Sequence, residues 1–288
     1  MKLGTIFLTL ALSISALANN KVIYGEDNRL DIFEVTNSMH LRLAKATAGK
    51  VSNYNLDELP NGNFRMSGGK LNVCSDDKFS GQVTSATCSG FLVGHEGKEY
   101  LVTAGHCITS SSSCSSHKWV FDYALTEEGQ ENIEVGKDSI YTCKRIVERQ
   151  LNSGTQSDYA VLELDRKVVG REPLKMRSSG EIKRGEEILV IGHPTGLPSK
   201  VADDSYVRNS SNNVFFQTNL DTFAGNSGSA VFNARTGDVE GILVRGHTDY
   251  QSRRGSDGKY CRTPVVCDMD SCRGEDVTKI TIIKEFKK

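Results

Sequence analysis

The sequence has no excess of charge of either sign, no internal repeat and no long apolar segment beyond its first residues. Its 35 Lys and Arg against 36 Asp and Glu leave a net charge of −1, so nothing attracts the chain as a whole to nucleic acid or to an anionic membrane. After residue 14 no run approaches the roughly 18 apolar residues of a membrane-spanning helix. Paired CxxC motifs are also missing, and no histidine lies within 261-CRTPVVCDMDSC-272, which argues against zinc. We therefore expect no nucleic-acid or membrane partner and no cofactor.

The first residues do carry a recognisable pattern. Lys2 precedes the apolar stretch 3-LGTIFLTLALSI-14, and Ala16–Ala18 has the small residues of a cleavage site. This pattern predicts a signal peptide over residues 1–18, cleaved near Ala18, and a secreted or periplasmic protein. The alternative is an uncleaved membrane anchor, for which the apolar stretch is short.

Eight cysteines follow, and an even number in an exported chain predicts four disulfides. Cys88 and Cys107 flank one hairpin and should pair across it, and Cys114 and Cys143 flank the next hairpin-like stretch. The remaining four allow three pairings, one of which joins the first of them to the C-terminal cluster. These four are Cys74, Cys261, Cys267 and Cys272.

Short runs rich in Val, Ile, Phe and Tyr recur from residue 81 onward, separated by Gly, Ser, Asn and charged turns. This spacing is typical of antiparallel strands in a sandwich or barrel. A charged, loop-like seam at 165–185 divides the region into two similar halves without a long linker, so we expect the halves to pack face to face. The expected strands lie at 90–94, 99–104, 118–125, 158–164, 187–192, 214–219, 229–233 and 239–246, with a short helix at 38–46.

The resulting division of the chain has four parts. After the signal peptide we expect an N-terminal segment at 19–70, with a possible short propeptide at 19–21. A first β-barrel should span 71–170, and a second, with a disulfide-rich C-terminal part, should span 171–288.

Three separated segments carry the residues of a nucleophilic site: 101-LVTAGHC-107, 157-SDYAVLEL-164 and 221-DTFAGNSGSAVF-232. A serine hydroxyl is a poor nucleophile at neutral pH and needs an imidazole base, which in turn needs a carboxylate to fix its tautomer. His106, Asp158 and Ser227 supply these groups, each at a strand end or turn. The other histidines, His40, His95, His117, His193 and His247, lie in turn-like or polar contexts and lack this setting.

The motifs TAGHC, SDYAVLEL and GNSGSAVF resemble the signatures of the chymotrypsin-like serine endopeptidases, in that family's order. The resemblance covers roughly residues 75–250 and is closest to bacterial exported members, including glutamyl endopeptidases. It implies an all-β fold of two six-stranded antiparallel barrels with the active site in the cleft between them. It also implies that His106 is the base, Asp158 its orienting carboxylate and Ser227 the nucleophile, with the N–H groups of Gly225 and Ser227 as the oxyanion hole. We expect a monomer that acts on proteins or peptides through an acyl-enzyme.

The sequence departs from the animal digestive members at Asn226, where an Asp would pair with the new N-terminus. The stretch 22-VIYGEDNR-29 is similar to the mature start of bacterial members, so a cut after Lys21 could expose Val22 as a maturation step.

The substrate preference stays open at this stage. Asp221 lies six residues before Ser227, where it either selects Lys and Arg side chains or caps a turn. Thr222 matches a glutamyl-pocket threonine, but Leu243 replaces the histidine expected with it. Residues Val244, Arg245 and Gly246 are expected to pair with the substrate backbone as an added strand. Two rival functions remain: an inactive protease-like binding protein, and an esterase with the same triad.

Overall fold

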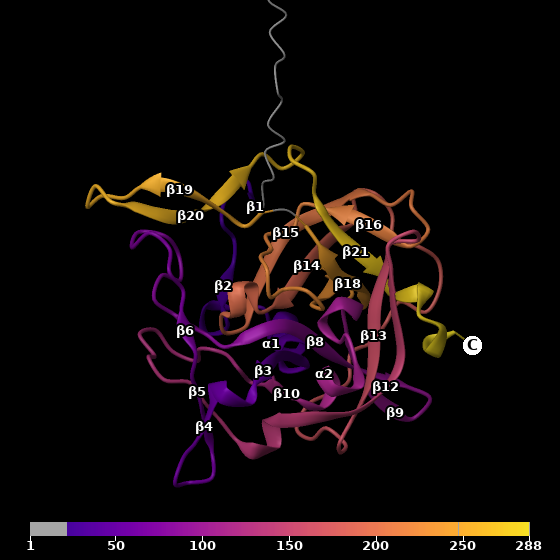
Figure 1. Ribbon diagram of the computed structural model, residues 1–288. Helices are drawn as coiled ribbons and strands as arrows, with labels where there is room; N and C mark the ends of the chain where they lie inside the picture. Colours follow the sequence, from indigo (N-terminus) through magenta and orange to yellow (C-terminus); the bar gives the residue numbers. More distant parts are fainter. Residues whose placement is uncertain (1–21, 247, 288) are drawn as a thin grey trace, which may run out of the picture.

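The computed structural model describes residues 22–246 and 248–287. The expected signal peptide, the expected propeptide at 19–21 and His247 therefore lie outside the described residues. The described chain forms two β-barrels, drawn in purple and magenta below and in orange to yellow above in Figure 1.

The first barrel closes through six strands, all neighbours being antiparallel. In spatial order they are β10 (His117–Phe121), β12 (Ile140–Asn152), β13 (Ser157–Leu164), β9 (Lys98–Thr103), β8 (Ala86–His95) and β3 (Thr47–Ser52). The strand β3 belongs to the segment that we expected to precede this barrel, so its start at residue 71 was placed too late. Its sequence, TAGKVS, has too few large apolar residues to stand out as a strand.

The second barrel also closes through six antiparallel strands, because β14 pairs with both β17 and β15. A seventh strand, β2 (Leu30–Asp31), adds to the outer edge of β15. The ring runs β14 (Glu187–Gly192), β17 (Ala230–Asn233), β18 (Val239–Arg245), β21 (Glu275–Lys279), β16 (Phe215–Thr218) and β15 (Lys200–Asn209). The predicted fold of two six-stranded barrels is confirmed.

The two barrels share one continuous apolar core. Phe91 of the first barrel and Ile191 and Phe232 of the second belong to the same cluster of fully buried side chains. A bridge between Val93 and Leu174 adds backbone pairing where the chain crosses from one barrel to the other. This crossing lies between β13 and β14, at the expected seam, and the shared core fixes the barrels face to face.

The remaining elements are short. The helix α1 (Ser38–Lys45) agrees with the prediction, and α2 (Ser111–Ser115) follows the His-bearing turn. A hairpin of β19 (Tyr250–Arg254) and β20 (Tyr260–Cys267) projects from the body in Figure 1 and pairs with β1 (Val22–Tyr24). The other strands are β4 (Leu56–Glu58), β5 (Phe64–Met66), β6 (Gly69–Lys70), β7 (Val83–Thr84) and β11 (Glu134–Val135).

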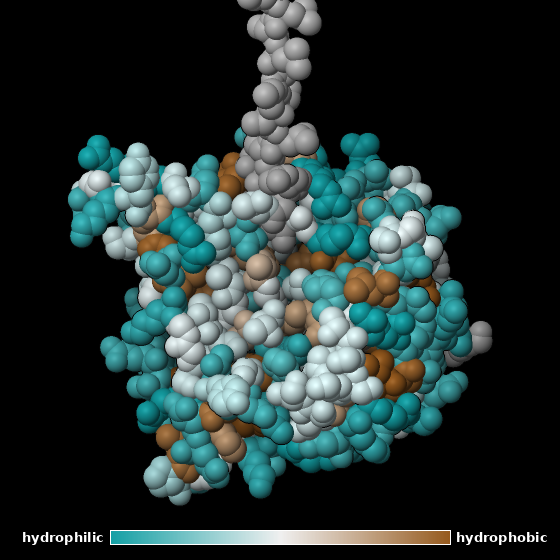
Figure 2. All heavy atoms as spheres, in the orientation of Figure 1, coloured by the Kyte–Doolittle hydropathy of each residue, from teal (hydrophilic) through white to brown (hydrophobic). Residues whose placement is uncertain are grey.

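Hydrophilic residues dominate the face shown in Figure 2, and apolar residues are scattered over it. Within residues 22–246 and 248–287, no helix has the length and apolar character to cross a membrane.

Candidate active site

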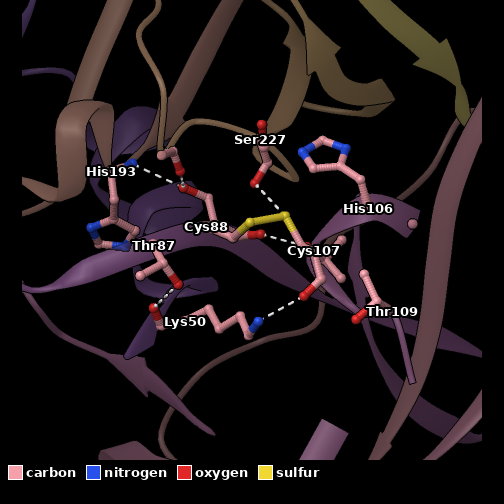
Figure 3. Close-up of a disulfide and its surroundings, with 12 residues drawn as sticks. Lys50, Thr87, Cys88, His106, Cys107, Thr109, His193 and Ser227 are labelled. Atoms are coloured by element: carbon pink, nitrogen blue, oxygen red, sulfur yellow. Dashed lines mark hydrogen bonds between the residues drawn. A yellow bond between two sulfur atoms is a disulfide. The ribbon is translucent and has the colours of Figure 1, made fainter. Parts of the chain in front are cut away.

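His106 lies in a short turn that follows β9. The turn, Gly105–Cys107, is 3-10 helical, and two cations hold its carbonyls. Arg149 Nε donates to Gly105 O at 2.8 Å, and Lys50 Nζ donates to Cys107 O at 2.7 Å, as drawn in Figure 3. A Cβ on Gly105 would lie 2.0 Å from a backbone carbonyl of β12, so only glycine fits there. The turn is therefore fixed to the wall of the first barrel.

Asp158, the second residue of β13, fixes the His106 ring. One carboxylate oxygen accepts the backbone N–H of His106 at 3.0 Å, and the other lies 2.8 Å from Nδ1. Asp158 is 2% exposed, and its carboxylate, as an acceptor, assigns the imidazole proton to Nδ1. The ring is left with Nε2 as a proton acceptor, the tautomer that a general base requires.

Ser227 reaches the same place from the second barrel. Its carbonyl accepts the N–H of Ser89 at 2.8 Å and lies 3.5 Å from Cys107 Sγ. Figure 3 shows its side chain beside the His106 ring, above the disulfide. In the described part of the chain the Ser227 hydroxyl is not hydrogen-bonded to the ring, and such contacts often tighten only when substrate binds. The structure thus brings together the three residues that the sequence singled out.

The peptide bonds that precede Gly225 and Ser227 both have their carbonyl groups hydrogen-bonded within the protein. The carbonyl of Ala224 accepts the N–H of Thr195, and the carbonyl of Asn226 accepts the N–H of Ser229 at 2.9 Å. In a planar trans peptide the N–H points opposite to its carbonyl, so the N–H groups of Gly225 and Ser227 face the other way. Two such donors beside a nucleophile are suited to hold an oxyanion.

Gly225 is needed for this arrangement. Its φ of +95° is rarely adopted by other residues, and a Cβ there would meet His193 O at 2.5 Å.

Ser89 fastens the nucleophile loop to the first barrel, a role that the sequence did not reveal. Besides its N–H bond to Ser227, its hydroxyl donates to Gly225 O at 2.8 Å and accepts the N–H of His193 at 3.0 Å. Its carbonyl accepts the hydroxyl of Thr103 at 2.7 Å. Ser89 is fully buried, and every one of its polar groups is used.

The rings of the remaining described histidines have other partners. His193 is fully buried, donates from Nδ1 to Leu197 O at 3.0 Å and stacks on Tyr123. Burial lowers its pKa to about 4, so the ring is neutral at pH 7 and has a structural role. His40 lies near Asp203, His95 packs on Phe286, and His117 contacts Ser116.

The Asp221 carboxylate is buried against the N-terminal segment. One oxygen accepts the N–H of Tyr24 at 2.7 Å, and the other accepts the N–H of Asn28 at 3.3 Å. Burial raises the pKa of this carboxyl to about 7. The geometry supports the capping role over the role in substrate selection, with Asp221 tying the N-terminal segment to the second barrel.

Thr222 turns into the second barrel instead. Its hydroxyl donates to Glu275 Oε2 at 2.6 Å, and both side chains have no exposed surface. The sequence did not suggest Glu275, because 53 residues separate the two partners and no motif surrounds it.

The predicted substrate strand at 244–246 adjoins the site but is only partly available. Leu243 is buried in the second barrel, and its backbone bonds to Gly228 and Ser229. Val244 is buried too, whereas Gly246 is half-exposed and follows the end of β18.

The Arg245 guanidinium is held by Asp276 and by the carbonyl of Gln156. It therefore braces the second barrel against the β12–β13 turn, and an acidic substrate residue would have to compete with these partners for the guanidinium.

All eight cysteines are paired. The predicted bonds Cys88–Cys107 and Cys114–Cys143 are confirmed. The open question is resolved as Cys74–Cys261 and Cys267–Cys272. The grouping of His106 with Cys88 and Cys107 is no thiolate metal site, because both sulfurs are in a disulfide.

A family model described as a trypsin-like peptidase domain matches residues 88–242. No curated protein matches the chain. Among solved structures, a Glu endopeptidase in complex with MPD is 17% identical, with coverage of 85% of this chain and 93% of that chain and a TM-score of 0.44. The VesB protease of Vibrio cholerae is 14% identical over 90% of this chain and 65% of its own, with a TM-score of 0.52. The second likeness agrees with the two-barrel fold.

Proposed function

Because the chain belongs to the trypsin-like peptidase family and is a serine endopeptidase, we propose that His106, Asp158 and Ser227 are its catalytic triad and that it works outside the cytoplasm. The observation that carries the proposal is the pair of hydrogen bonds that His106 donates, from its backbone N–H and from Nδ1, to the carboxylate of Asp158. A histidine whose ring and backbone are both fixed by one buried carboxylate is oriented for general-base catalysis.

The reaction follows from these groups. Ser227 Oγ attacks the carbonyl carbon of the scissile peptide bond while Nε2 of His106 takes the hydroxyl proton. The N–H groups of Gly225 and Ser227 stabilise the oxyanion, and Asp158 stabilises the imidazolium. The imidazolium then protonates the departing amine, which leaves an acyl-enzyme on Ser227. A water molecule, deprotonated by His106, hydrolyses the ester and restores the hydroxyl.

Export is supported by the cysteines. Four disulfides and no free thiol among the described residues suit an oxidising compartment. We propose a secreted or periplasmic monomer that acts on protein or peptide substrates without a cofactor.

Two measurements test the proposal. A fluorophosphonate should label the mature protein at Ser227, and Ser227→Ala should reduce kcat on a peptide substrate by roughly a million-fold without change in the circular dichroism spectrum. Matched replacement of Ser229, which points into the second barrel, should leave labelling intact. Absence of labelling would favour the inactive binding protein, and hydrolysis of esters without hydrolysis of peptides would favour the esterase.

A further inference from the structure

Thr195 adopts a backbone conformation that its own side chain disfavours. It has a φ of 53° and a ψ of 20°, in the left-handed region, within the turn Pro194–Gly196. For a β-branched residue this region is an outlier, because the branched side chain crowds the backbone. Such strain persists only where the surroundings enforce it, and it gathers at functional sites. The backbone and the side chain of Thr195 each make a contact that accounts for it.

The backbone N–H of Thr195 holds the peptide that carries one of the proposed oxyanion donors. It donates to the carbonyl of Ala224, which shares a planar peptide with the N–H of Gly225, so the direction of one group sets the direction of the other. The two loops pack backbone to backbone, because a Cβ on Gly225 would lie 3.2 Å from Thr195 N. Without a Cβ, Gly225 does little to restrict this peptide, which therefore depends on Thr195 to keep its orientation.

The side chain of Thr195 is held by the projecting hairpin of β19 and β20 (Figure 1). Its hydroxyl lies 2.6 Å from the hydroxyl of Tyr250, the first residue of β19. Burial raises the pKa of Tyr250 above its ordinary value, so the phenol keeps its proton at neutral pH. The Tyr250 ring packs on Phe223 with the centroids 5.3 Å apart, and the Arg262 guanidinium of β20 lies 4.7 Å from its centroid. Tyr250 is therefore a fixed partner for Thr195.

The residue before Tyr250 holds the other polar group of Ala224. Asp249 accepts the N–H of Ala224 at 2.9 Å. The root of the hairpin thus fixes Ala224 from both sides, its N–H directly through Asp249 and its carbonyl through Thr195. A displacement of this root would reach the peptide in front of Gly225.

We propose that Tyr250 is a positioning residue for the oxyanion hole: its hydroxyl keeps Thr195 left-handed, and the Thr195 N–H keeps the N–H of Gly225 directed at the oxyanion. The proposal rests on the proposed function, because it needs Gly225 to stabilise that oxyanion. Without the hydroxyl bond, Thr195 relaxes to a negative φ and its N–H turns away from Ala224. The freed peptide then rotates, and the donor is lost from the site. Tyr250 acts in this way without contacting the substrate.

Tyr250→Phe removes the hydroxyl and keeps the ring on Phe223. We expect kcat on a peptide substrate to fall by about 10-fold, less than when an oxyanion donor itself is removed. A peptide boronate, which mimics the tetrahedral state, should lose affinity by a similar factor, whereas a product peptide should bind as before. The matched control is Tyr100→Phe, which removes a hydroxyl bonded to Glu285 near the C-terminus and should leave kcat unchanged.

Two replacements at residue 195 separate the backbone conformation from the hydroxyl bond itself. Thr195→Val and Thr195→Gly both lose the hydroxyl, but only glycine adopts a positive φ without strain. Thr195→Val should show the same loss of kcat as Tyr250→Phe, and the two changes combined should cost no more than either alone. Thr195→Gly should be about 10-fold faster than Thr195→Val, because it needs no partner to stay left-handed.

Three results would overturn the proposal: an unchanged boronate affinity in Tyr250→Phe, equal losses in Tyr250→Phe and Tyr100→Phe, or equal rates in Thr195→Val and Thr195→Gly. If Tyr250→Phe does not fold, the comparison at residue 195 decides. Fluorophosphonate labelling of the wild-type protein keeps the two proposals apart. Labelling of Ser227 together with any of these three results would refute the role of Tyr250 alone, whereas an unlabelled wild type would refute the proposed function.

Discussion

The backbone N–H of Ser89 donates to the carbonyl oxygen of Ser227 across 2.8 Å. Ser89 directly follows Cys88, whose disulfide partner Cys107 directly follows His106. One short stretch of the first barrel therefore holds both His106, the proposed base, and, through hydrogen bonds, the loop of the second barrel that carries Ser227, the proposed nucleophile.

Removal of the Ser89 hydroxyl should loosen the oxyanion hole. In Ser89→Ala the Gly225 carbonyl loses its donor, so we expect kcat to fall by about 10-fold, less than when an oxyanion donor itself is removed, with KM nearly unchanged. A peptide boronate that mimics the tetrahedral state should lose affinity in parallel, whereas a product peptide should not. The control is Ser139→Ala, which removes a buried hydroxyl bonded to Asp122 on the far part of the first barrel. Equal effects of the two variants would mean that Ser89 only stabilises the fold.

Gly228 should tolerate no side chain. A Cβ there would lie 2.1 Å from Ser89 O and 2.2 Å from the Thr103 hydroxyl, so Gly228→Ala must push the nucleophile loop from the first barrel. We expect a loss of at least about 100-fold in kcat/KM, the effect of a misplacement near 1 Å. Gly129→Ala has a similar positive φ with nothing within 4 Å and should retain activity. Fluorophosphonate titration would give the fraction of active Gly228→Ala. Full activity would show that the contact between the Ser227 loop and the first barrel can accommodate a side chain at residue 228.

His193 should make the fold sensitive to acid. Burial lowers its pKa to about 4, below the ordinary 6.5, so the unfolded chain binds a proton in this range and the folded chain does not. The stability that the neutral His193 ring contributes to the fold is fully present above about pH 6.5. It is lost as the pH falls toward 4, by up to about 3 kcal/mol. The free energy of unfolding, measured with urea at about pH 7 and about pH 4.5, should differ less between these two pH values in His193→Gln than in the wild type. If the free energy of unfolding changed equally with pH in the variant and in the wild type, the acid sensitivity would come from other groups.

The strands that the sequence predicted are the apolar ones, and the strands that it missed carry buried charges. Lys200 on β15 is almost fully buried, and its carboxylate partner Asp31 lies 169 residues away along the chain. Hydropathy patterns count such residues as exposed, because the partner that makes burial tolerable is not visible locally.

The same contrast between local patterns and long-range contacts explains which residues of the candidate site the sequence could identify. Each residue of the proposed triad lies in a local motif at a strand end or turn, so the sequence could single out all three. Ser89 acts through contacts that form only when the two barrels meet, and no local pattern marks it. Asp221 shows the opposite case. Its position six residues before Ser227 suggested a role in substrate selection, but the sequence could not show that its carboxylate is hydrogen-bonded to Tyr24 and Asn28.

The Cys74–Cys261 bond should stabilise the fold more than Cys267–Cys272 does. The first closes a separation of 187 residues and joins the projecting hairpin to the loop before β7, whereas the second closes only 5. In the chain-entropy model the losses on replacement are about 5 and about 2 kcal/mol. Paired Cys→Ser replacement at each bond, followed by urea unfolding, compares them within one protein, and near-equal losses would mean that native strain or residual unfolded structure outweighs loop entropy. Because the hairpin root contacts Phe223 through Tyr250, loss of the longer bond should also raise KM, while loss of the shorter should not.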